Sequence, residues 1–297
     1  MRAIVTGHKG YIGGNLYREL QKQGHTVAGI DLRSCDINGK ELPGADICDG
    51  FPIEFYEFIP DVIFHLAAIP RVEYSVQNPV LVMRNNVLST SKTLKFAKHV
   101  NAPVIYSSSS SVVGNGNGPC SPYALSKYVG EMESLMYTKL YRVKAVALRY
   151  FNVYSYDQEA DSEYATVVCN WKKYISEGRV PYITGDGEQR RDMTHVDDVV
   201  SANIFCANNI NKHDLWGHWY DVGSGDNISL NELKEIVKKY FPDLSFEYRP
   251  PRAGDVGFTK ADLSKFNSHG WNSKVNLSQG LSAVYERLLN EDITGKR

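Results

Sequence analysis

The chain has 297 residues, 42% of them hydrophobic, and its 33 Lys and Arg side chains nearly balance its 34 Asp and Glu side chains. This length can bury a large core in one domain or in two closely packed ones. The balanced charge lacks the basic excess of nucleic-acid-binding proteins, so we expect no nucleic-acid partner. The five cysteines are dispersed and form no Cys-x-x-Cys pair, so we expect neither a disulfide framework nor a metal site.

The apolar segments predict neither a secretory signal nor a membrane span. The amino terminus becomes polar within its first few residues and carries no long apolar run. The long uncharged stretch 100–126 is rich in Ser, Asn, Gly and Pro instead of apolar residues. We therefore expect a cytoplasmic protein with no membrane partner.

The first half of the chain alternates short apolar segments with longer helical ones. Expected strands are 2–6, 26–31, 62–66, 104–108 and 145–149. Expected crossover helices are 13–23, 85–100 and 123–141, with a less regular link through 46–59. This alternation predicts an α/β fold with a doubly wound parallel (Rossmann) sheet, in which ligands bind outside the carboxyl ends of the strands.

A glycine-rich loop follows the first expected strand. Gly7, Gly10 and Gly13 have the spacing G-x-x-G-x-x-G at the start of an amphipathic helix. Such glycines allow a tight turn and let a pyrophosphate approach backbone N–H groups at the positive end of the helix dipole. The spacing alone also occurs in ordinary strand-to-helix turns, so it needs a second observation.

Asp31 supplies that observation, because it ends the second strand roughly 20 residues after the glycines, where a carboxylate binds the ribose hydroxyls of a dinucleotide. The two features together predict a dinucleotide site. The carboxylate would repel a 2′-phosphate and so favours NAD over NADP. Arg33 nearby keeps the second cofactor open.

Tyr123 and Lys127 predict a proton-transfer site. They lie four positions apart at the start of an expected helix, so their side chains share a face. A neighbouring ammonium and a positive nicotinamide ring would lower the pKa of the phenol and make it a usable base. Such a pair is common on surface helices, and Ser109, at the end of the preceding strand, favours the catalytic interpretation. Cofactor hydroxyls would give the isolated Lys127 ammonium its partners.

The regular alternation ends after Asn152, which predicts two domains. We expect a dinucleotide-binding domain in residues 1–152 and a smaller mixed α/β substrate lobe in 153–297. Residues 195–208 have a helical pattern, and 219–225 have the pattern of a strand running into a glycine turn. We expect segment 195–225 to rejoin the amino-terminal sheet.

A series of motifs follows in order from residue 1 to about 285: TGHKGYIGG, GADI, HLAA, NNVLST, YSSSSSVVG, SPYALSK, LRYFNVYS, GDGEQRRDMTHVDDV, YDVGSG and RAGDVGFTKADLSK. The series resembles the extended short-chain dehydrogenase/reductases that act on nucleotide sugars, nearest to enzymes similar to UDP-glucose 4-epimerase. The resemblance is specific for this superfamily and less specific for the reaction.

The resemblance completes the set of candidate residues. Those expected to bind the cofactor are Gly7, Gly10, Tyr11, Ile12, Gly13, Asp31, Asp46, Ile47, Leu66, Ala67, Ala68, Asn86, Ser107, Tyr123 and Lys127. Those expected to be catalytic are Ser109, Tyr123 and Lys127, and those expected to bind substrate are Ser109, Asn152, Arg191, Arg252, Asp255 and Thr259. The two arginines would hold the diphosphate through bidentate hydrogen bonds.

The reaction implied by the resemblance is inversion at C4 of a nucleotide-diphosphate sugar, a UDP-hexose or UDP-N-acetylhexosamine, through a transient 4-keto sugar. Related dehydratases carry an acidic pair, and decarboxylases a Glu, after the catalytic Ser or Thr, where this chain has Ser110 and Ser111. Two alternatives stay open: a 4-keto-sugar reductase or dehydrogenase of the same family, and a non-catalytic NAD-binding sensor.

Two finer expectations concern specificity and assembly. Thr259 aligns with a wall near the sugar 2-substituent, where a small side chain admits an N-acetyl group, unless Phe258 fills the gap. Helix 123–141 carries more apolar surface than packing on one sheet requires. Together with 85–100 it is expected to form half of a four-helix homodimer interface.

Overall fold

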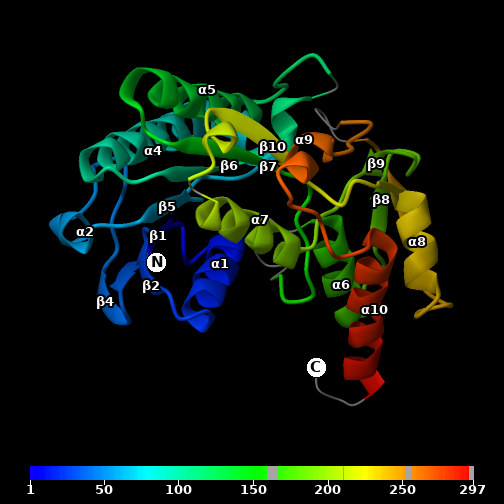
Figure 1. Cartoon of the computed structure of the whole chain (residues 1–297). Coiled ribbons are helices and arrows are strands. Elements are labelled where there is room, and N and C mark those ends of the chain that lie inside the picture. The colour runs from blue at the N-terminus through cyan, green and yellow to red at the C-terminus, as the bar shows by residue number, and fades with distance from the viewer. Residues whose placement is uncertain (115, 159–165, 210, 252–255, 294–297) are drawn as a thin grey trace.

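The computed structural model describes residues 1–114, 116–158, 166–209, 211–251 and 256–293 (Figure 1). Among these residues, no helix is both long and apolar enough to cross a membrane.

An eight-stranded sheet forms the centre of the larger lobe, in the order β10-β7-β6-β5-β1-β2-β3-β4. Its parallel strands are β1 (Arg2–Thr6), β2 (Thr26–Ile30), β5 (Val62–His65), β6 (Val104–Ser109), β7 (Ala145–Tyr150) and β10 (His218–Val222). The strand order reverses between β1 and β5, which is where doubly wound sheets bind their ligands. The predicted α/β fold is therefore confirmed.

The two sheet faces are covered by different helices, and Figure 1 shows them as layers above and below the sheet. One face packs on α1 (Tyr11–Lys22) and α7 (Val196–Asn208), through residues such as Val5 and Leu16. The other packs on α4 (Pro79–Val100) and α5 (Pro122–Tyr141), through residues such as Ile4 and Leu94. Alternate residues of each strand thus serve opposite cores. The short helices α2 (Ile53–Phe58) and α3 (Val72–Gln77) lie in the crossover segments before α4.

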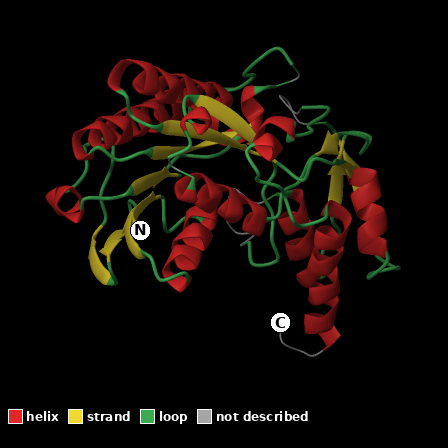
Figure 2. Cartoon of the chain, viewed as in Figure 1, coloured by secondary structure: helices red, strands yellow, loops and turns green. Residues whose placement is uncertain are grey.

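Segment 195–225 lies against this sheet, because α7 contacts α1 and β10 pairs in parallel with β7. The second lobe (Figure 2) is built on a separate core of buried side chains such as Trp171, Leu233 and Leu281. Its elements are α6 (Val167–Ser176), β8 (Tyr182–Thr184), β9 (Arg190–Arg191), β11 (Ile228–Ser229), α8 (Leu230–Lys238), β12 (Glu247–Arg249) and α10 (Leu277–Ile293). Short turns of helix complete the described elements: η1 (Ser110–Val112), η2 (His213–Leu215) and α9 (Ser264–Ser268).

The expected link through 46–59 contains the short helix α2, and an antiparallel hairpin that was not expected precedes it. The hairpin consists of β3 (Ser34–Ile37) and β4 (Lys40–Pro43), and it extends the sheet beyond β2. Asn38 and Gly39 form its turn, with φ of 56° and 81°. An Asn-Gly pair with positive φ is the usual two-residue hairpin turn, since its twist matches that of the strands.

The inner face of α5 is made of small and polar residues. Ser121 caps the helix by accepting the N–H of Ala124 at 3.1 Å, and Pro122 occupies its first turn. A Cβ on Gly130 would overlap the Tyr106 hydroxyl of β6, so this glycine lets α5 approach the sheet closely. The close approach is what buries Lys127 and Glu131.

Candidate active site

The glycine loop lies between the ends of β1, β2 and β5. Gly7 has φ of +72°, a conformation that favours glycine, and a Cβ there would lie 2.9 Å from the Ala67 nitrogen. Gly10 donates its N–H to the Gly7 carbonyl at 2.9 Å and begins α1 with no side-chain cap. A Cβ on Gly13 would overlap the same carbonyl. The loop therefore leaves the start of α1 accessible to a phosphate, so these residues fit the pyrophosphate of a dinucleotide.

Asp31 directly follows β2 beside this loop. Its carboxylate accepts the backbone N–H of Lys9 at 3.2 Å and of Arg33 at 3.1 Å. The Arg33 guanidinium lies 3.6 Å from the same carboxylate and donates to the Lys9 carbonyl. Asp31 thus both shapes the loop and carries the charge that opposes a 2′-phosphate.

We expect Asp31→Ala to weaken NAD binding about tenfold, the value of one charge-assisted hydrogen bond, and to relax discrimination against NADP. Arg33 would then be released toward a 2′-phosphate. Calorimetric titration with both cofactors measures the change. Asp31→Asn is the control, because its amide oxygen still accepts the Lys9 N–H while the charge is gone. If the wild type prefers NADP, the ribose assignment is wrong.

A buried hydrogen-bond network holds the segment after β5. Leu66 and Ala67 donate their N–H groups to the Thr6 hydroxyl, each at 3.0 Å. The Thr6 hydroxyl lies 2.9 Å from His65 Nδ1, and since it already accepts two hydrogen bonds it donates its proton to that nitrogen. Burial, with a smaller effect of Lys127, lowers the pKa of His65 to about 3, so the imidazole is neutral.

Asn86 joins the same segment to the catalytic helix. Its amide accepts the N–H of Ile69 at 2.8 Å and donates to the Ile69 carbonyl at 3.1 Å and to Ser126 at 3.0 Å. Ser126 in turn donates to the Tyr123 carbonyl at 2.7 Å. These bonds fix the start of α5 relative to the cofactor edge of the sheet.

The other expected cofactor residues lie around this edge. Tyr11 donates its hydroxyl to Ser155 at 2.8 Å, and Ile12 packs on the core under α1. Ala68 is half-buried after β5. Asp46 is exposed and accepts the N–H of Cys48 at 2.8 Å, whereas the Ile47 side chain is in the core. Ile47 can therefore meet a cofactor through its backbone alone.

Tyr123, Lys127 and the end of β6 come together as expected. The Lys127 ammonium is buried and donates to the Ser107 carbonyl at 2.7 Å, and it lies 5.2 Å from the centroid of the Tyr106 ring. Burial lowers its pKa to about 7, an effect that Glu131 opposes. The site therefore holds a lysine whose charge responds to its neighbours near neutral pH.

The expected lowering of the Tyr123 pKa includes the charge of a bound nicotinamide ring, and the protein's own groups shift this pKa in the other direction. Burial raises the pKa of this phenol, and a hydrogen bond with Ser109 only partly opposes the change. The protein's own groups therefore disfavour the phenolate instead of favouring it.

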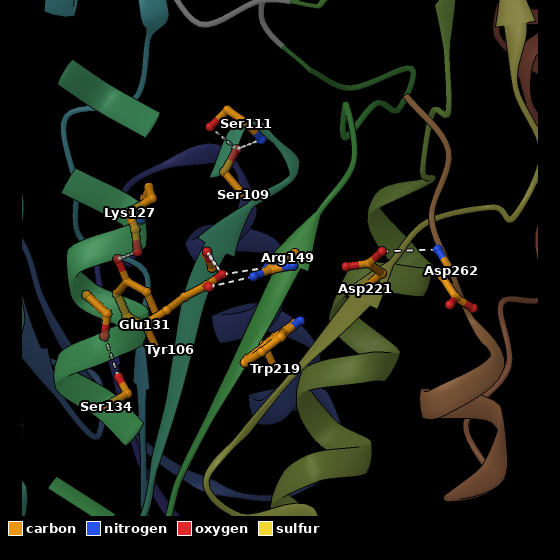
Figure 3. Close-up of polar contacts among 12 residues, drawn as sticks. Tyr106, Ser109, Ser111, Lys127, Glu131, Ser134, Arg149, Trp219, Asp221 and Asp262 are labelled. Carbon is orange, nitrogen blue, oxygen red and sulfur yellow. Dashed lines mark hydrogen bonds and ion pairs between the residues drawn. The ribbon is translucent and has the colours of Figure 1, made fainter. Parts of the chain in front are cut away.

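Ser109 is oriented by a residue that the sequence did not single out for this role. Ser111 donates to the Ser109 hydroxyl oxygen twice, from its N–H at 3.3 Å and from its own hydroxyl at 3.0 Å (Figure 3). Because both bonds place donors on the Ser109 oxygen, the Ser109 proton is free to point toward Tyr123 or a substrate oxygen.

Three of the described substrate candidates, Asn152, Arg191 and Thr259, gather around Asp192, whereas Ser109 lies at the end of β6. Asn152, with φ of 35° after β7, donates to the Asp192 carbonyl at 2.6 Å. The Asp192 N–H donates to the Thr259 hydroxyl at 3.2 Å, and Arg191 precedes it on β9, half-buried. The fully buried Asp192 carboxylate accepts bonds from Ser224, Gly225 and Ala261. Arg252 and Asp255 lie outside the described residues.

The described residues contain no group of three or more His, Cys, Asp or Glu side chains that could hold a metal ion. The constellation is instead a dinucleotide loop at the switch point of a parallel sheet with a Ser, Tyr and Lys set beside it. This combination defines a nucleotide-cofactor enzyme of the short-chain type.

The chain belongs to the NAD dependent epimerase/dehydratase family, whose model matches residues 3–223. It is 33% identical to the UDP-glucose 4-epimerase of Mycolicibacterium smegmatis over 98% of this chain and 99% of that one. UDP-sugar decarboxylases are also among its relatives. The family is one of NAD-dependent enzymes that act on nucleotide sugars.

Solved structures agree over the full length. The UDP-N-acetylglucosamine 4-epimerase from Methanobrevibacter ruminantium, in complex with UDP-N-acetylmuramic acid, is 29% identical, covers 98% of each chain and gives a TM-score of 0.85. The Thermus thermophilus UDP-glucose 4-epimerase in complex with NAD is 28% identical, with 97% and 99% of the chains covered and a TM-score of 0.83. NAD is the cofactor of this family.

Proposed function

We propose that the chain is an NAD-dependent 4-epimerase of a nucleotide-diphosphate sugar, either a UDP-hexose or a UDP-N-acetylhexosamine. The observation that carries the proposal is the placement of Tyr123 and Ser109, close enough for Ser109 to act on the pKa of the phenol, beside the buried Lys127 at the carboxyl edge of the sheet. The names of the relatives, which include 4-epimerases of UDP-glucose and UDP-N-acetylglucosamine, support it.

Each residue has a defined part in the proposed reaction. NAD, when bound, accepts hydride from C4 of the sugar and returns it. Tyr123 takes the proton of the 4-hydroxyl and later gives it back, while Ser109 donates a hydrogen bond to the reacting oxygen. Lys127 places a positive charge beside the phenol, which offsets the cost of burying a phenolate.

The residues after Ser109 argue against elimination or decarboxylation. Ser110 and Ser111 carry no carboxylate, and the Ser111 hydroxyl already donates its hydrogen bond to Ser109. An acid or base for loss of water is therefore missing from this turn. A reductase or dehydrogenase would use the same proposed site. It would differ from an epimerase in releasing a product that has gained or lost a hydride.

A product screen separates these alternatives. Purified protein with NAD is incubated with UDP-glucose, UDP-galactose and their N-acetyl forms, and NMR detects the 4-epimer. An epimerase produces the epimer with no steady rise in nicotinamide absorbance. A rise that follows turnover indicates a dehydrogenase, and NAD binding without conversion of any sugar indicates a sensor.

The proposed N-acetyl tolerance rests on Thr259. Its hydroxyl faces the Asp192 backbone and its side chain is small, whereas Phe258 is 57% exposed. Arg191 on β9 and Arg252 are proposed to hold the diphosphate, with Asp255 at the same end of the substrate, and Asn152 is proposed to contact a phosphate of the sugar nucleotide.

We also propose a homodimer through α4 and α5. Helix α5 carries two stripes of apolar residues that face away from the sheet, and none of these residues is buried: Leu125, Tyr128 and Leu135 in one stripe, and Val129, Met132, Met136 and Leu140 in the other. On the adjacent α4, Val80 is 79% exposed. Such a continuous apolar face favours association of two copies.

Sedimentation at micromolar concentration should therefore show a dimer, and Met136→Asp should dissociate it, because the new carboxylate would be buried between the two copies. Lys139→Gln is the control, since it lies on the same helix and adds no buried charge. A monomeric wild type would contradict the proposed interface.

A further inference from the structure

A buried ion pair lies one helical turn below Lys127. Glu131 of α5 is fully buried, and Arg149 of β7 binds it in a bidentate manner, with Nε to Oε1 and Nη2 to Oε2 both at 2.8 Å. Ser108 of β6 donates a third hydrogen bond to Oε1 at 2.5 Å. Figure 3 shows Glu131 reaching from the helix across to the strand that carries Arg149.

Arg149 is itself held from the other side. Its guanidinium carbon lies 4.8 Å from the centroid of the Trp219 ring on β10. The Glu131 carboxylate is therefore fixed by donors from two strands, and it cannot swing toward or away from its own helix. Such rigid clamping is more than a helix needs for packing, because Gly130 and Ser134 already pack this face on the sheet.

Lys127 shares this face with Glu131, since the two lie four positions apart on α5. The groups around the Lys127 ammonium are Glu131 on α5, Tyr106 and the Ser107 carbonyl on β6, and neutral His65 on β5. Beyond Glu131, Asp221 on β10 interacts with both members of the Glu131–Arg149 pair. Glu131 is the acidic group that acts on the ammonium.

We propose that Glu131, clamped by Arg149 and Ser108, is a positioning residue that favours the charged form of Lys127, one turn from the proposed base Tyr123. The inference rests on the catalytic part proposed above for Lys127. A buried ion pair is weak evidence for stability alone, because desolvation offsets most of the attraction. Because the Glu131–Arg149 pair lies one helical turn from Lys127, its carboxylate can also act on the charge of the Lys127 ammonium.

The direction of the effect follows from the charges. Burial favours the neutral amine, and the Glu131 carboxylate favours the ammonium, so the pKa of Lys127 settles at about 7. Removal of the carboxylate lowers it further, and Lys127 then loses its proton at a lower pH. Arg149 keeps Asp221 as an acidic neighbour when the Glu131 carboxylate is removed.

The test is a direct titration of Lys127 in Glu131→Gln by NMR of ¹³C-labelled lysine, with the resonance assigned by its loss in Lys127→Met. We expect the midpoint to move about one to two pH units to lower pH. In Glu131→Gln with Arg149→Met, the midpoint should also lie below that of the wild type, because the carboxylate is missing there too. Glu133→Gln is the matched control, because Glu133 lies on the same helix and accepts a bond from Ser91 of α4 instead.

The double variant keeps the test valid if Glu131→Gln fails to fold, since it leaves no unpaired buried charge. A midpoint in the folded double variant equal to that of the wild type would overturn the proposal. The titration does not depend on turnover, so a chain that converts no nucleotide sugar still tests it. Where epimerisation is measured, the alkaline limb of kcat against pH should move with the midpoint, whereas a purely structural role would lower kcat equally at all pH values.

Discussion

Replacement of Tyr123 by phenylalanine should lower epimerase activity by about 10²- to 10⁴-fold, the usual contribution of general acid–base catalysis. The phenol is the proposed proton acceptor, and its loss leaves Ser109 and Lys127 with no base between them. The cofactor loop at Gly7 to Gly13 is on other elements, so NAD should still bind. Epimer formation measured by NMR, with NAD affinity by calorimetry, checks both parts.

Tyr128→Phe is the matched control, because Tyr128 lies on the same helix and is 38% exposed, facing away from the sheet. Its activity should equal that of the wild type. An active Tyr123→Phe enzyme would show that another residue is the base, and this result would contradict the proposed chemistry. Loss of NAD binding in the same variant would show instead that the phenol shapes the pocket.

The environment of Tyr123 explains why a single hydroxyl carries so much of the effect. Burial raises the pKa of the phenol, and a hydrogen bond with Ser109 partly opposes the change. In the proposed mechanism the Lys127 ammonium opposes it as well. The ammonium is itself costly to bury, which lowers the pKa of Lys127 to about 7. In the proposed mechanism the pKa values of Tyr123 and Lys127 therefore depend on each other, and Glu131 contributes through its effect on Lys127.

The sheet could be predicted from the sequence because each parallel strand is a short apolar run buried on both faces. Gly7, Asp31 and Ser109 all lie at carboxyl ends of strands, so their proximity follows from the fold. The hairpin of β3 and β4 was missed although Asn38 and Gly39 are a recognisable turn signal. Its strands contain Asp36, Lys40 and Glu41, so they lack the apolar alternation by which strands are identified.

The polarity of α5 reverses the usual pattern. Its apolar stripes face outward, and the face on the sheet carries Ala124, Gly130 and Ser134. Lys127 was identifiable from the sequence and Glu131 was not, because charged pairs four apart are typical of exposed helix surfaces. Only the three-dimensional structure brings Arg149 to Glu131, since the two come from different elements whose register no local pattern specifies.

The substrate lobe was the least predictable part of the site. Asp192 collects four donors from segments far apart in the chain, including the Ser224 turn and Ala261. Each of these segments is short and irregular, so periodicity gives no information about how they meet. The resemblance to a known family identified Asn152 and Thr259 as candidates, and the structure shows that both contact the Asp192 backbone.

The second large effect is expected at Gly13, where alanine should weaken NAD binding by about 100-fold, equivalent to the loss of two charge-assisted hydrogen bonds. The added Cβ would overlap the Gly7 carbonyl oxygen and lie 2.8 Å from its carbon, so the loop must move away from the start of α1. The N–H groups there would then no longer converge on a pyrophosphate. Gly14→Ala is the control, because its Cβ would meet the flexible Arg18 side chain and the His8 carbonyl oxygen at 3.3 Å. Equal NAD affinities for the two variants in calorimetry would show that this loop does not hold the pyrophosphate.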